Sequence, residues 1–436
     1  MKSFMFKSIN FSIVSMLMLC CHQPTRATNI HTEFQSDRLF GDRGTSEFYI
    51  PPKILPNQAG KLIKFEDIKG VHIPESAGRA VRILYVSTSG IGKSEPIAVS
   101  GQIFFPKSPA PKGGWPIISW EHGTTGIADV CAPSWRGYFA RDRTYLNKWL
   151  DAGFVIVASD YQGLGTPGPH PYLLYKSESY SILDALRASL LQYKYLLNNK
   201  IILVGQSQGG GAALGAGWMA PRYAPELNII GVVATGIVTA FHTPQTGTYP
   251  QISAPNKEPP HMAAAFGILT VEGSQKSLHP EMDMRSFLTE KGEAFSHEAR
   301  QTCLGSLFKY ADKNDVTEEN VYTNSLGALQ KVYREEFTIP DAHLTMPVFV
   351  GTGLADNEAG VAQQYNAVAA MCDAGTKVIW KKYPGLTHNG AVNGASADAL
   401  SFVKALIRGK KLYGYCKGIK PISDIETPES NIPFNN

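Results

Sequence analysis

The sequence lacks the features that assign a chain to several large classes of protein. It has no C-x-x-C or H-E-x-x-H spacing and no phosphate-binding loop of the G-x-x-x-x-G-K type. After the first 21 residues it has no apolar run long enough to cross a bilayer, and it contains no internal repeat or low-complexity segment. These absences argue against zinc proteases of that type, P-loop enzymes and proteins with several membrane spans.

Excess charge of one sign is also missing, because 41 Lys and Arg stand against 37 Asp and Glu, which gives a formal net charge of +4. Part of this excess lies at the N-terminus, where two lysines precede an apolar stretch from Phe11 to Cys21 and a small residue, Ala27, follows. This pattern predicts a secretory signal peptide over residues 1–27. Its removal takes away three basic residues and no acid and leaves +1, which argues against nucleic acid as a partner.

The signal peptide predicts an exported protein, periplasmic or secreted. A buried N-terminal helix or a membrane anchor is the alternative, although the apolar stretch is short for a bilayer. Lipoprotein anchoring through Cys20 or Cys21 is less favoured, because the residue directly before such a cysteine is normally small and is Leu19 or Cys20 here.

Cysteine is scarce, with four residues beyond the signal peptide: Cys131, Cys303, Cys372 and Cys416. An even number in an exported chain predicts two disulfides. Three pairings are open. We favour Cys131 with Cys303 and Cys372 with Cys416, because the second pair would tie the C-terminal tail to the last core segment. A zinc site is disfavoured because the cysteines lie far apart in the sequence.

Short runs rich in β-branched residues predict strands that begin near residues 81, 96, 115, 154, 201, 229, 346 and 377. Several are apolar throughout, as in central strands of a parallel sheet that is covered on both faces. The early runs follow one another closely, whereas helical segments separate the later ones. The pattern predicts an α/β fold with a mostly parallel central sheet and an antiparallel start.

More than a hundred residues separate the strands expected near 229 and 346, far more than one crossover helix requires. We therefore expect a helical cap or lid inserted at residues 241–340, with residues 28–240 and 341–436 forming the core. Apolar segments near 261 and 319 are expected to form helices over the sheet, or to pack the cap's own core. The tail after Tyr415 is expected to lie on the surface.

Ser207 lies in G-Q-S-Q-G, directly after an expected strand and before a run of small residues typical of a helix. Such a sharp strand-to-helix turn holds its central residue in strained geometry, so Gly205 and Gly209 are expected to prevent collisions. The helix N-terminus then favours developing negative charge. This context predicts a nucleophile elbow. The alternative is a glycine-rich loop that only supports packing.

A serine nucleophile needs a base to take its proton and an acid to orient that base. Asp356 and His388 follow the last two expected strands, which gives the order Ser, Asp, His of α/β-hydrolases. We expect His388 to be the base and Asp356 its partner. Glu358 competes for the acid role, whereas Asp160 is expected to organise the glycine-rich turn that follows it. A surface-loop histidine is the alternative for His388.

Acyl transfer also needs hydrogen-bond donors for the oxyanion. One is expected from the backbone N–H of Gln208, the residue after the serine. The other is expected from the loop H-G-T-T-G after the strand near 115, where Gly123 and Thr124 offer close backbone approach. His122 in this loop is interpreted as a structural residue.

Four segments, GQSQGG, EHGTTGIADVCAPS, DYQGLGTPGPHPYL and the GLAD and GLTH pair, together resemble the secretory lipase family of α/β-hydrolases, the fungal lipase A-type enzymes and their bacterial relatives. The resemblance covers residues 50–415. It implies a capped α/β-hydrolase fold, a triad of Ser207, Asp356 and His388, and an oxyanion site from the HGTTG loop and Gln208.

The resemblance also implies a disulfide from Cys131 to a cap cysteine, for which Cys303 is available. The fungal enzymes carry an acidic residue in the oxyanion loop where this chain has HGTTG, which favours esters of shorter acyl chains over long-chain triglycerides.

The sequence thus predicts a serine carboxylic-ester hydrolase, a lipase or esterase, that forms an acyl-serine intermediate on lipid or short-to-medium acyl esters. It needs no metal or organic cofactor, and no obligate protein partner is evident. Transient contact of the cap with a lipid surface stays open. The alternatives are a peptidase on the same fold and a non-catalytic hydrolase-fold binding protein.

Overall fold

The computed structural model describes residues 44–70, 73–242, 249–252, 258–323, 336–422 and 424–435. The predicted signal peptide, with Cys20 and Cys21, lies outside these ranges, as does most of the cap helix expected near residue 319. Within the described ranges, no helix is long and apolar enough to cross a membrane.

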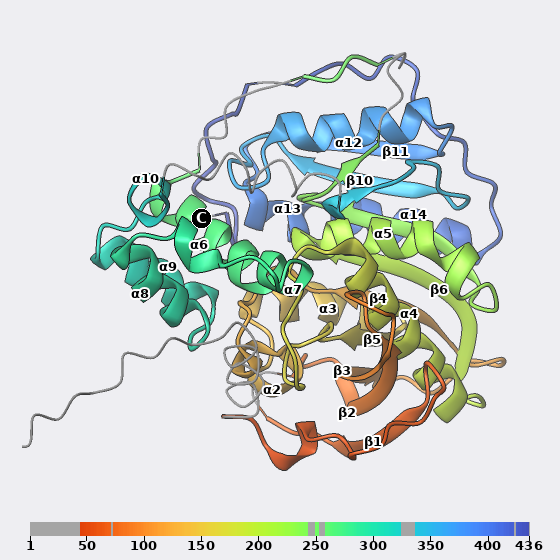
Figure 1. Ribbon diagram of the computed structural model, residues 1–436. Helices are drawn as coiled ribbons and strands as arrows, with labels where there is room; N and C mark the ends of the chain where they lie inside the picture. Colours follow the sequence, from red (N-terminus) through yellow and green to blue (C-terminus); the bar gives the residue numbers. More distant parts are fainter. Residues whose placement is uncertain are drawn as a thin grey trace, which may run out of the picture.

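A nine-stranded sheet forms the centre of the protein (Figure 1). In chain order its strands are β1 (Leu62–Asp67), β2 (Ala77–Thr88), β3 (Pro96–Pro106), β4 (Trp115–Glu121), β5 (Val155–Ser159), β6 (Leu197–Gln206), β7 (Ile229–Thr235), β10 (Val348–Gly353) and β11 (Val378–Tyr383). Across the sheet they lie in the order β1-β2-β3-β5-β4-β6-β7-β10-β11.

The first strands pair antiparallel, from β1 through β2 and β3 to β5, and all pairs from β5 to β11 are parallel. The expected α/β fold with an antiparallel start is therefore confirmed. β4 lies between β5 and β6, so the chain crosses over at this point. In open α/β sheets, ligands bind at the carboxyl ends of the strands next to such a crossover.

Helices cover both faces of the sheet because its central strands are apolar on both sides. Ile117 and Ile118 are neighbours in β4 and both fully buried, yet they belong to different apolar clusters. One cluster includes residues of α4 (Tyr175–Gln192), α5 (Gln208–Tyr223) and α12 (Val361–Asp373), and the other includes residues of α3 (Ala140–Asp151) and α14 (Ser396–Ile407). This alternation follows from the two-residue repeat of a strand.

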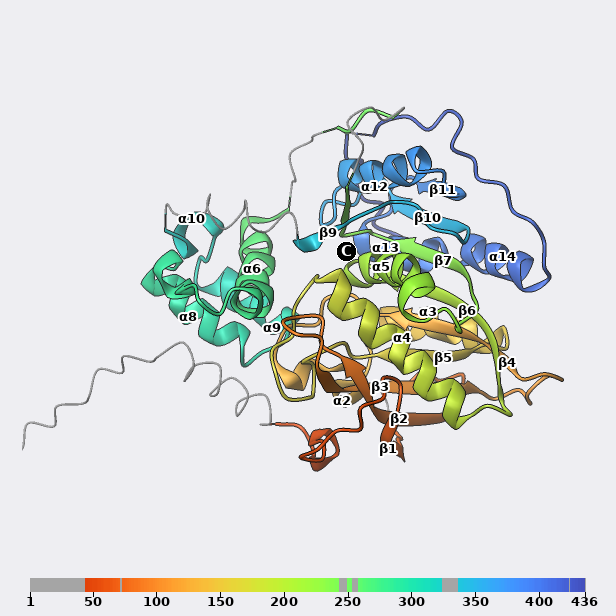
Figure 2. The same cartoon turned by 45° about the vertical axis from the view of Figure 1, so that its right-hand side comes forward.

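Between β7 and β10 the chain forms a separate group of helices, seen beside the sheet in Figures 1 and 2. Its elements are α6 (Pro260–Thr270), a π-helical turn at Val271–Gln275, α7 (Lys276–Leu278), a 3₁₀ turn at Met284–Phe287, α8 (Glu290–Ala299), α9 (Leu304–Lys313) and α10 (Glu318–Val321). We call these described residues, 258–323, the helical segment. Its apolar residues pack on one another, as in Ile268, Phe295 and Leu307, which are fully buried.

A two-residue parallel pair connects the chain on either side of this segment. β8 (Ala240–Phe241) pairs with β9 (Thr338–Ile339). A disulfide adds a further link, because Cys131 at the end of a 3₁₀ turn (Asp129–Cys131) is bonded to Cys303, the residue directly before α9, with the two Cα atoms 5.4 Å apart.

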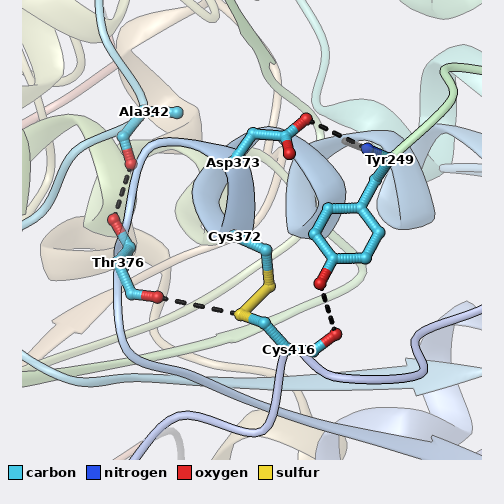
Figure 3. Close-up of a disulfide and its surroundings, with 6 residues drawn as sticks. All are labelled: Tyr249, Ala342, Cys372, Asp373, Thr376 and Cys416. Carbon is cyan, nitrogen blue, oxygen red and sulfur yellow. Dashed lines mark hydrogen bonds between the residues drawn. A yellow bond between two sulfur atoms is a disulfide. The ribbon is translucent and has the colours of Figure 1, made fainter. Parts of the chain in front are cut away.

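The second disulfide joins Cys372, in α12, to Cys416 in the C-terminal tail (Figure 3). Both pairings are the ones favoured from the sequence. Around this bond, the hydroxyl of Tyr249 donates to the carbonyl of Cys416 over 2.8 Å, and the hydroxyl of Thr376 donates to the carbonyl of Ala342 over 2.7 Å. The tail is thus attached to the core about twenty residues before its end.

Beyond this bond the tail runs along the surface, as expected, and then returns to the core. Figures 1 and 2 place the C-terminus near α13 (His388–Gly394). Asn435 is buried there and is 8% exposed, which the sequence did not predict.

Candidate active site

Ser207 forms the turn between β6 and α5. Its backbone dihedrals are φ 62° and ψ −124°, a left-handed conformation that costs a non-glycine residue on the order of 1–3 kcal/mol. A Cβ atom on Gly205 would lie 1.9 Å from the carbonyl oxygen of Gly209, and one on Gly209 would lie 1.8 Å from that of Glu121. Only glycine fits at these two positions, so both glycines are needed to hold Ser207 in this turn.

Asp356 and His388 follow the carboxyl ends of β10 and β11, at the same edge of the sheet as Ser207. Nδ1 of His388 donates to Oδ2 of Asp356 over 2.9 Å, and Asp356 is fully buried. The same carboxylate accepts from the backbone N–H groups of Glu358 and Ala359, both over 3.0 Å, and from the side chain of Gln364 over 2.7 Å. Asp356, rather than Glu358, therefore orients His388.

Asp356 and His388 each stabilise the charged form of the other. Burial opposes the charge on Asp356, but His388 and the backbone donors outweigh it and hold the pKa of this carboxyl below its ordinary value. Burial also opposes the charge on His388, yet Asp356 and Glu358 outweigh it and raise the pKa of His388 to about 9. Because Nδ1 carries the proton that binds Asp356, Nε2 is the nitrogen left to accept another.

Gly236 makes room for the imidazole ring. It follows β7 with a φ of +55°, and a Cβ atom there would lie 2.6 Å from Cε1 and 2.8 Å from Nδ1 of His388. No residue with a side chain fits this position without moving His388. Sequence reasoning missed Gly236 because its only signal is a glycine at a strand end.

The loop after β4 reaches the same cavity as the serine. Gly123, Thr124, Ser207 and His388 all line it. The hydroxyl of Thr124 is hydrogen-bonded to that of Tyr172 over 2.8 Å, which fixes the loop to the segment before α4. A Cβ atom on Gly123 would lie 3.4 Å from Cβ of Ser207, so the loop passes close to the serine.

Gln208, the first residue of α5, lies in a buried polar network behind this loop. The first N–H groups of a helix have no partner within it, so the N–H of Gln208 is open to a ligand at the serine. Its side-chain amide donates to Oε1 of Glu178 over 2.8 Å and lies 3.2 Å from Nε2 of His170. Nδ1 of His170 is 2.8 Å from the carbonyl oxygen of Gln162 and so donates to it, which leaves Nε2 as an acceptor. The network fixes the start of α5.

Burial raises the pKa of Glu178 to about 8, although its hydrogen bond with Gln208 opposes the shift. Burial also raises the pKa of Glu121, at the end of β4, to about 8, and the nearby Glu178 adds to this. At neutral pH both carboxyls are therefore largely protonated, which keeps negative charge out of the region beneath the elbow.

His122 and Asp160 are also buried, but neither takes part in the hydrogen bond between Asp356 and His388. His122 lies within 2.8 Å of the carbonyl of Gly123 and stacks on Tyr161 at 4.3 Å, and burial lowers its pKa to about 4. This fits the structural role expected for it. The carboxylate of Asp160 accepts from Ser100 over 2.6 Å and from the backbone N–H of Ser134 over 2.8 Å. Asp160 therefore binds the start of α2 (Pro133–Arg136). The hydroxyl of Ser100 also lies 3.2 Å from the carbonyl oxygen of Leu164, so Asp160 is linked through Ser100 to the glycine-rich turn that it was expected to organise.

The cavity at the serine has a volume of about 280 Å³ and two unlike walls. One wall comes from the helical segment and is apolar, with Met262, Phe266, Leu304 and Phe308. A second wall comes from α2, the start of α3 and the residue directly before α3, and it carries two cations and an aromatic ring, Arg136, Arg141 and Phe139. Sequence reasoning did not find this second wall, since no motif marks it.

Phe434, next to the buried Asn435, also lines the cavity. The amide of Asn435 donates to the carbonyl of Gly385 over 2.8 Å, and its Oδ1 accepts the backbone N–H of Thr387 over 2.7 Å. Both partners belong to the loop that carries His388. The tail is thus part of the site.

Comparisons with known proteins identify the family and the fold. A family model described as secretory lipase matches residues 138–414. Lipase 5 of Candida albicans is 24% identical over 433 residues, covering 91% of this chain and 87% of that protein. A secreted triacylglycerol lipase of Malassezia globosa is 23% identical over 380 residues, covering 80% and 74%. The crystal structure of Candida antarctica lipase A in its closed state matches with a TM-score of 0.64 at 20% identity, covering 88% of this chain and 91% of that one.

Proposed function

This chain belongs to the secretory lipase family of carboxylic-ester hydrolases, and we propose that Ser207 is its nucleophile, His388 its general base and Asp356 the partner of that base. The observation that carries the proposal is the hydrogen bond of 2.9 Å from His388 to the buried Asp356, at the cavity that Ser207 also lines.

In the first step Ser207 Oγ attacks the ester carbonyl while Nε2 of His388 takes its proton. Asp356 holds the imidazole in the tautomer with a free Nε2 and stabilises the imidazolium that forms. The protonated His388 then gives its proton to the leaving alcohol, and an acyl-serine remains. Water activated by the same histidine hydrolyses the acyl-serine and restores Ser207.

Backbone N–H groups stabilise the oxyanion in both steps. One is the N–H of Gln208 at the start of α5, and the second comes from the loop at Gly123 and Thr124. The network of Gln208, His170 and Glu178 holds the first donor in place from behind. Removal of one such donor typically lowers kcat by about 10²- to 10³-fold.

The apolar wall of Met262, Phe266, Leu304 and Phe308 is suited to an acyl chain. A cavity of about 280 Å³ has room for a short or medium acyl chain. The Malassezia relative is named a triacylglycerol lipase, so this chain shares the ester chemistry of that name but we expect a shorter acyl preference.

The helical segment is proposed to be the main part of a cap inserted at residues 241–340, which supplies the acyl wall. Its edge is fixed at the oxyanion loop by the disulfide of Cys131 and Cys303 and by the backbone N–H of Leu304, which donates to the carbonyl of Thr125 over 2.9 Å. Export follows the secretory character of the family, with residues 1–27 as the proposed signal peptide.

Covalent labelling tests the assignment of the nucleophile. A fluorophosphonate probe should add to the mature protein at one site, and peptide mass spectrometry should find the label on Ser207. Ser207→Ala should take up no label, while Ser306→Ala, in the helical segment, should be labelled like the wild type. A label on another serine, or none on active protein, would contradict the proposal.

A further inference from the structure

Arg136, the last residue of α2, lines the cavity at Ser207, but its guanidinium has no hydrogen-bond acceptor within the described part of the chain. It is half-buried and lies over the ring of Phe139, with 4.2 Å from the guanidinium carbon to the ring centre. A guanidinium has five N–H donors, and a ring face satisfies none of them as an acceptor does. The donors of Arg136 are therefore open to a ligand in the cavity.

Arg141, the second cation of this wall, is held by protein partners. Its Nε donates to Oδ1 of Asp142 over 2.8 Å, and its other nitrogens donate to Gln206 over 3.2 Å and to Asn389. Asp142 is buried and hydrogen-bonded to Arg141, so it acts on Arg136 by electrostatic attraction and not by a hydrogen bond. Burial lowers the pKa of Arg136, and Asp142 opposes that shift. Arg136 remains a partly desolvated cation without an anion bonded to it.

The other charges around the cavity do not neutralise Arg136. Among the described lining residues Glu358 is the one acid, and it lies beside His388, whose pKa it helps to raise. The side chain of Asn389 lies between Glu358 and Arg141, since it is bonded to Arg141 and lies 3.5 Å from Glu358. The lining from α2 and α3 is therefore cationic, whereas the lining from the helical segment is apolar.

We propose that Arg136 binds an anionic group of the substrate, a carboxylate or a phosphate. This inference rests on the ester hydrolysis proposed above. The preferred substrates are then esters with an apolar acyl chain on the wall of the helical segment and an ionised group on the alcohol side, within reach of Arg136. A planar guanidinium binds a carboxylate or phosphate through two parallel hydrogen bonds, which makes this group selective as well as attractive.

Three hexanoyl esters that differ only at the end of the alcohol test this site: those of 3-hydroxypropanoate, of 3-hydroxypropanamide and of 2-hydroxyethyl phosphate. Release of hexanoate gives kcat/KM for each. The wild type should favour at least one anionic ester over the neutral amide by about 10- to 100-fold, the size of a charge-assisted hydrogen bond. The two anionic esters show whether carboxylate or phosphate is preferred. Added salt should reduce the preference.

Variants assign the preference to Arg136. Arg136→Gln should bring the ratio of anionic to neutral kcat/KM close to one, and Arg136→Lys should keep part of it. The matched control is Arg222→Gln, which removes an exposed guanidinium that lies over the ring of Trp218 at 4.4 Å, and it should retain the wild-type ratio.

The outcomes separate this site from the proposed function. If the wild type cleaves p-nitrophenyl hexanoate and the neutral amide ester but shows no preference for either anionic ester, the anionic site is wrong and ester hydrolysis stands. If the preference survives in Arg136→Gln, Arg136 is not the site. If the wild type cleaves none of these esters, both proposals fail.

Discussion

Asn435 accepts a hydrogen bond from the backbone N–H of Thr387, the residue directly before His388, over 2.7 Å. Its side-chain amide also donates to the carbonyls of Gly385 and Glu429, over 2.8 and 2.7 Å. A segment more than forty residues further along the chain thus holds two positions, Gly385 and Thr387, of the loop that leads into His388.

Asn435→Ala should therefore reduce activity more than stability. The substitution leaves the N–H of Thr387 and the carbonyl of Gly385 without this partner, at a cost of about 1–3 kcal/mol in the free energy of unfolding. Displacement of His388 should lower kcat by about 10-fold or more. Ester hydrolysis and urea unfolding measure the two effects. Asn431→Ala, at an exposed position of the same tail, should change neither. Wild-type kcat in Asn435→Ala would contradict this role of the tail.

The pH dependence of kcat/KM should follow the titration of His388. Its pKa is raised in the folded protein because Asp356 and Glu358 outweigh burial, and only the neutral imidazole acts as a base. Activity should therefore rise with pH, with a midpoint above the ordinary histidine value of about 6.5.

Glu358→Gln should move this midpoint to lower pH, because it removes one of the two carboxylates that raise the pKa of His388. Initial rates measured from pH 5 to pH 10 on one ester give both midpoints. The control is Glu281→Gln, in the helical segment at an exposed position. A midpoint for Glu358→Gln equal to or above that of the wild type would show that Glu358 does not act on His388.

Gly236→Ala should lower activity through a collision with the base. The added Cβ atom would lie 2.6 Å from Cε1 of His388, at a φ of +55° that also strains any residue with a side chain. We expect a loss of kcat/KM of about 100-fold. Gly92→Ala is a matched control, because Gly92 has a φ of +63° but no atom within 4 Å of the added Cβ.

The two variants separate strain from collision. Both should lose stability by about 1–3 kcal/mol through backbone strain, measured by thermal unfolding. Only Gly236→Ala should also lose activity. Equal activity in the two variants would mean that His388 moves aside without consequence.

The parts of this protein that the sequence predicted are those with a local pattern. Apolar strands, the glycines around Ser207, and acid and histidine after successive strands each follow from a few neighbouring residues. β1 was missed, since Leu62–Asp67 is only half-buried at its start and exposed at its end, which gives no apolar run or alternation.

Other parts depend on contacts between distant segments. Arg136 and Arg141 reach the cavity because α2 and α3 follow the loop after β4, and no motif marks either residue. Asn435 acts on Thr387 across 48 positions of the chain, and its neighbours resemble any polar tail. The role of Gly236 becomes clear only when the position of the His388 ring is known. These relationships are set by tertiary packing and leave no periodic signal in the sequence.

The most direct test of the account is the initial rate of hydrolysis of p-nitrophenyl esters of increasing acyl length by the mature protein, with Ser207→Ala and Asp356→Asn measured in parallel. The account predicts that the wild type cleaves short and medium chains best, that Asp356→Asn loses on the order of 10⁴-fold in kcat, and that Ser207→Ala loses at least about 10³-fold. Equal rates for the wild type and Ser207→Ala would contradict it.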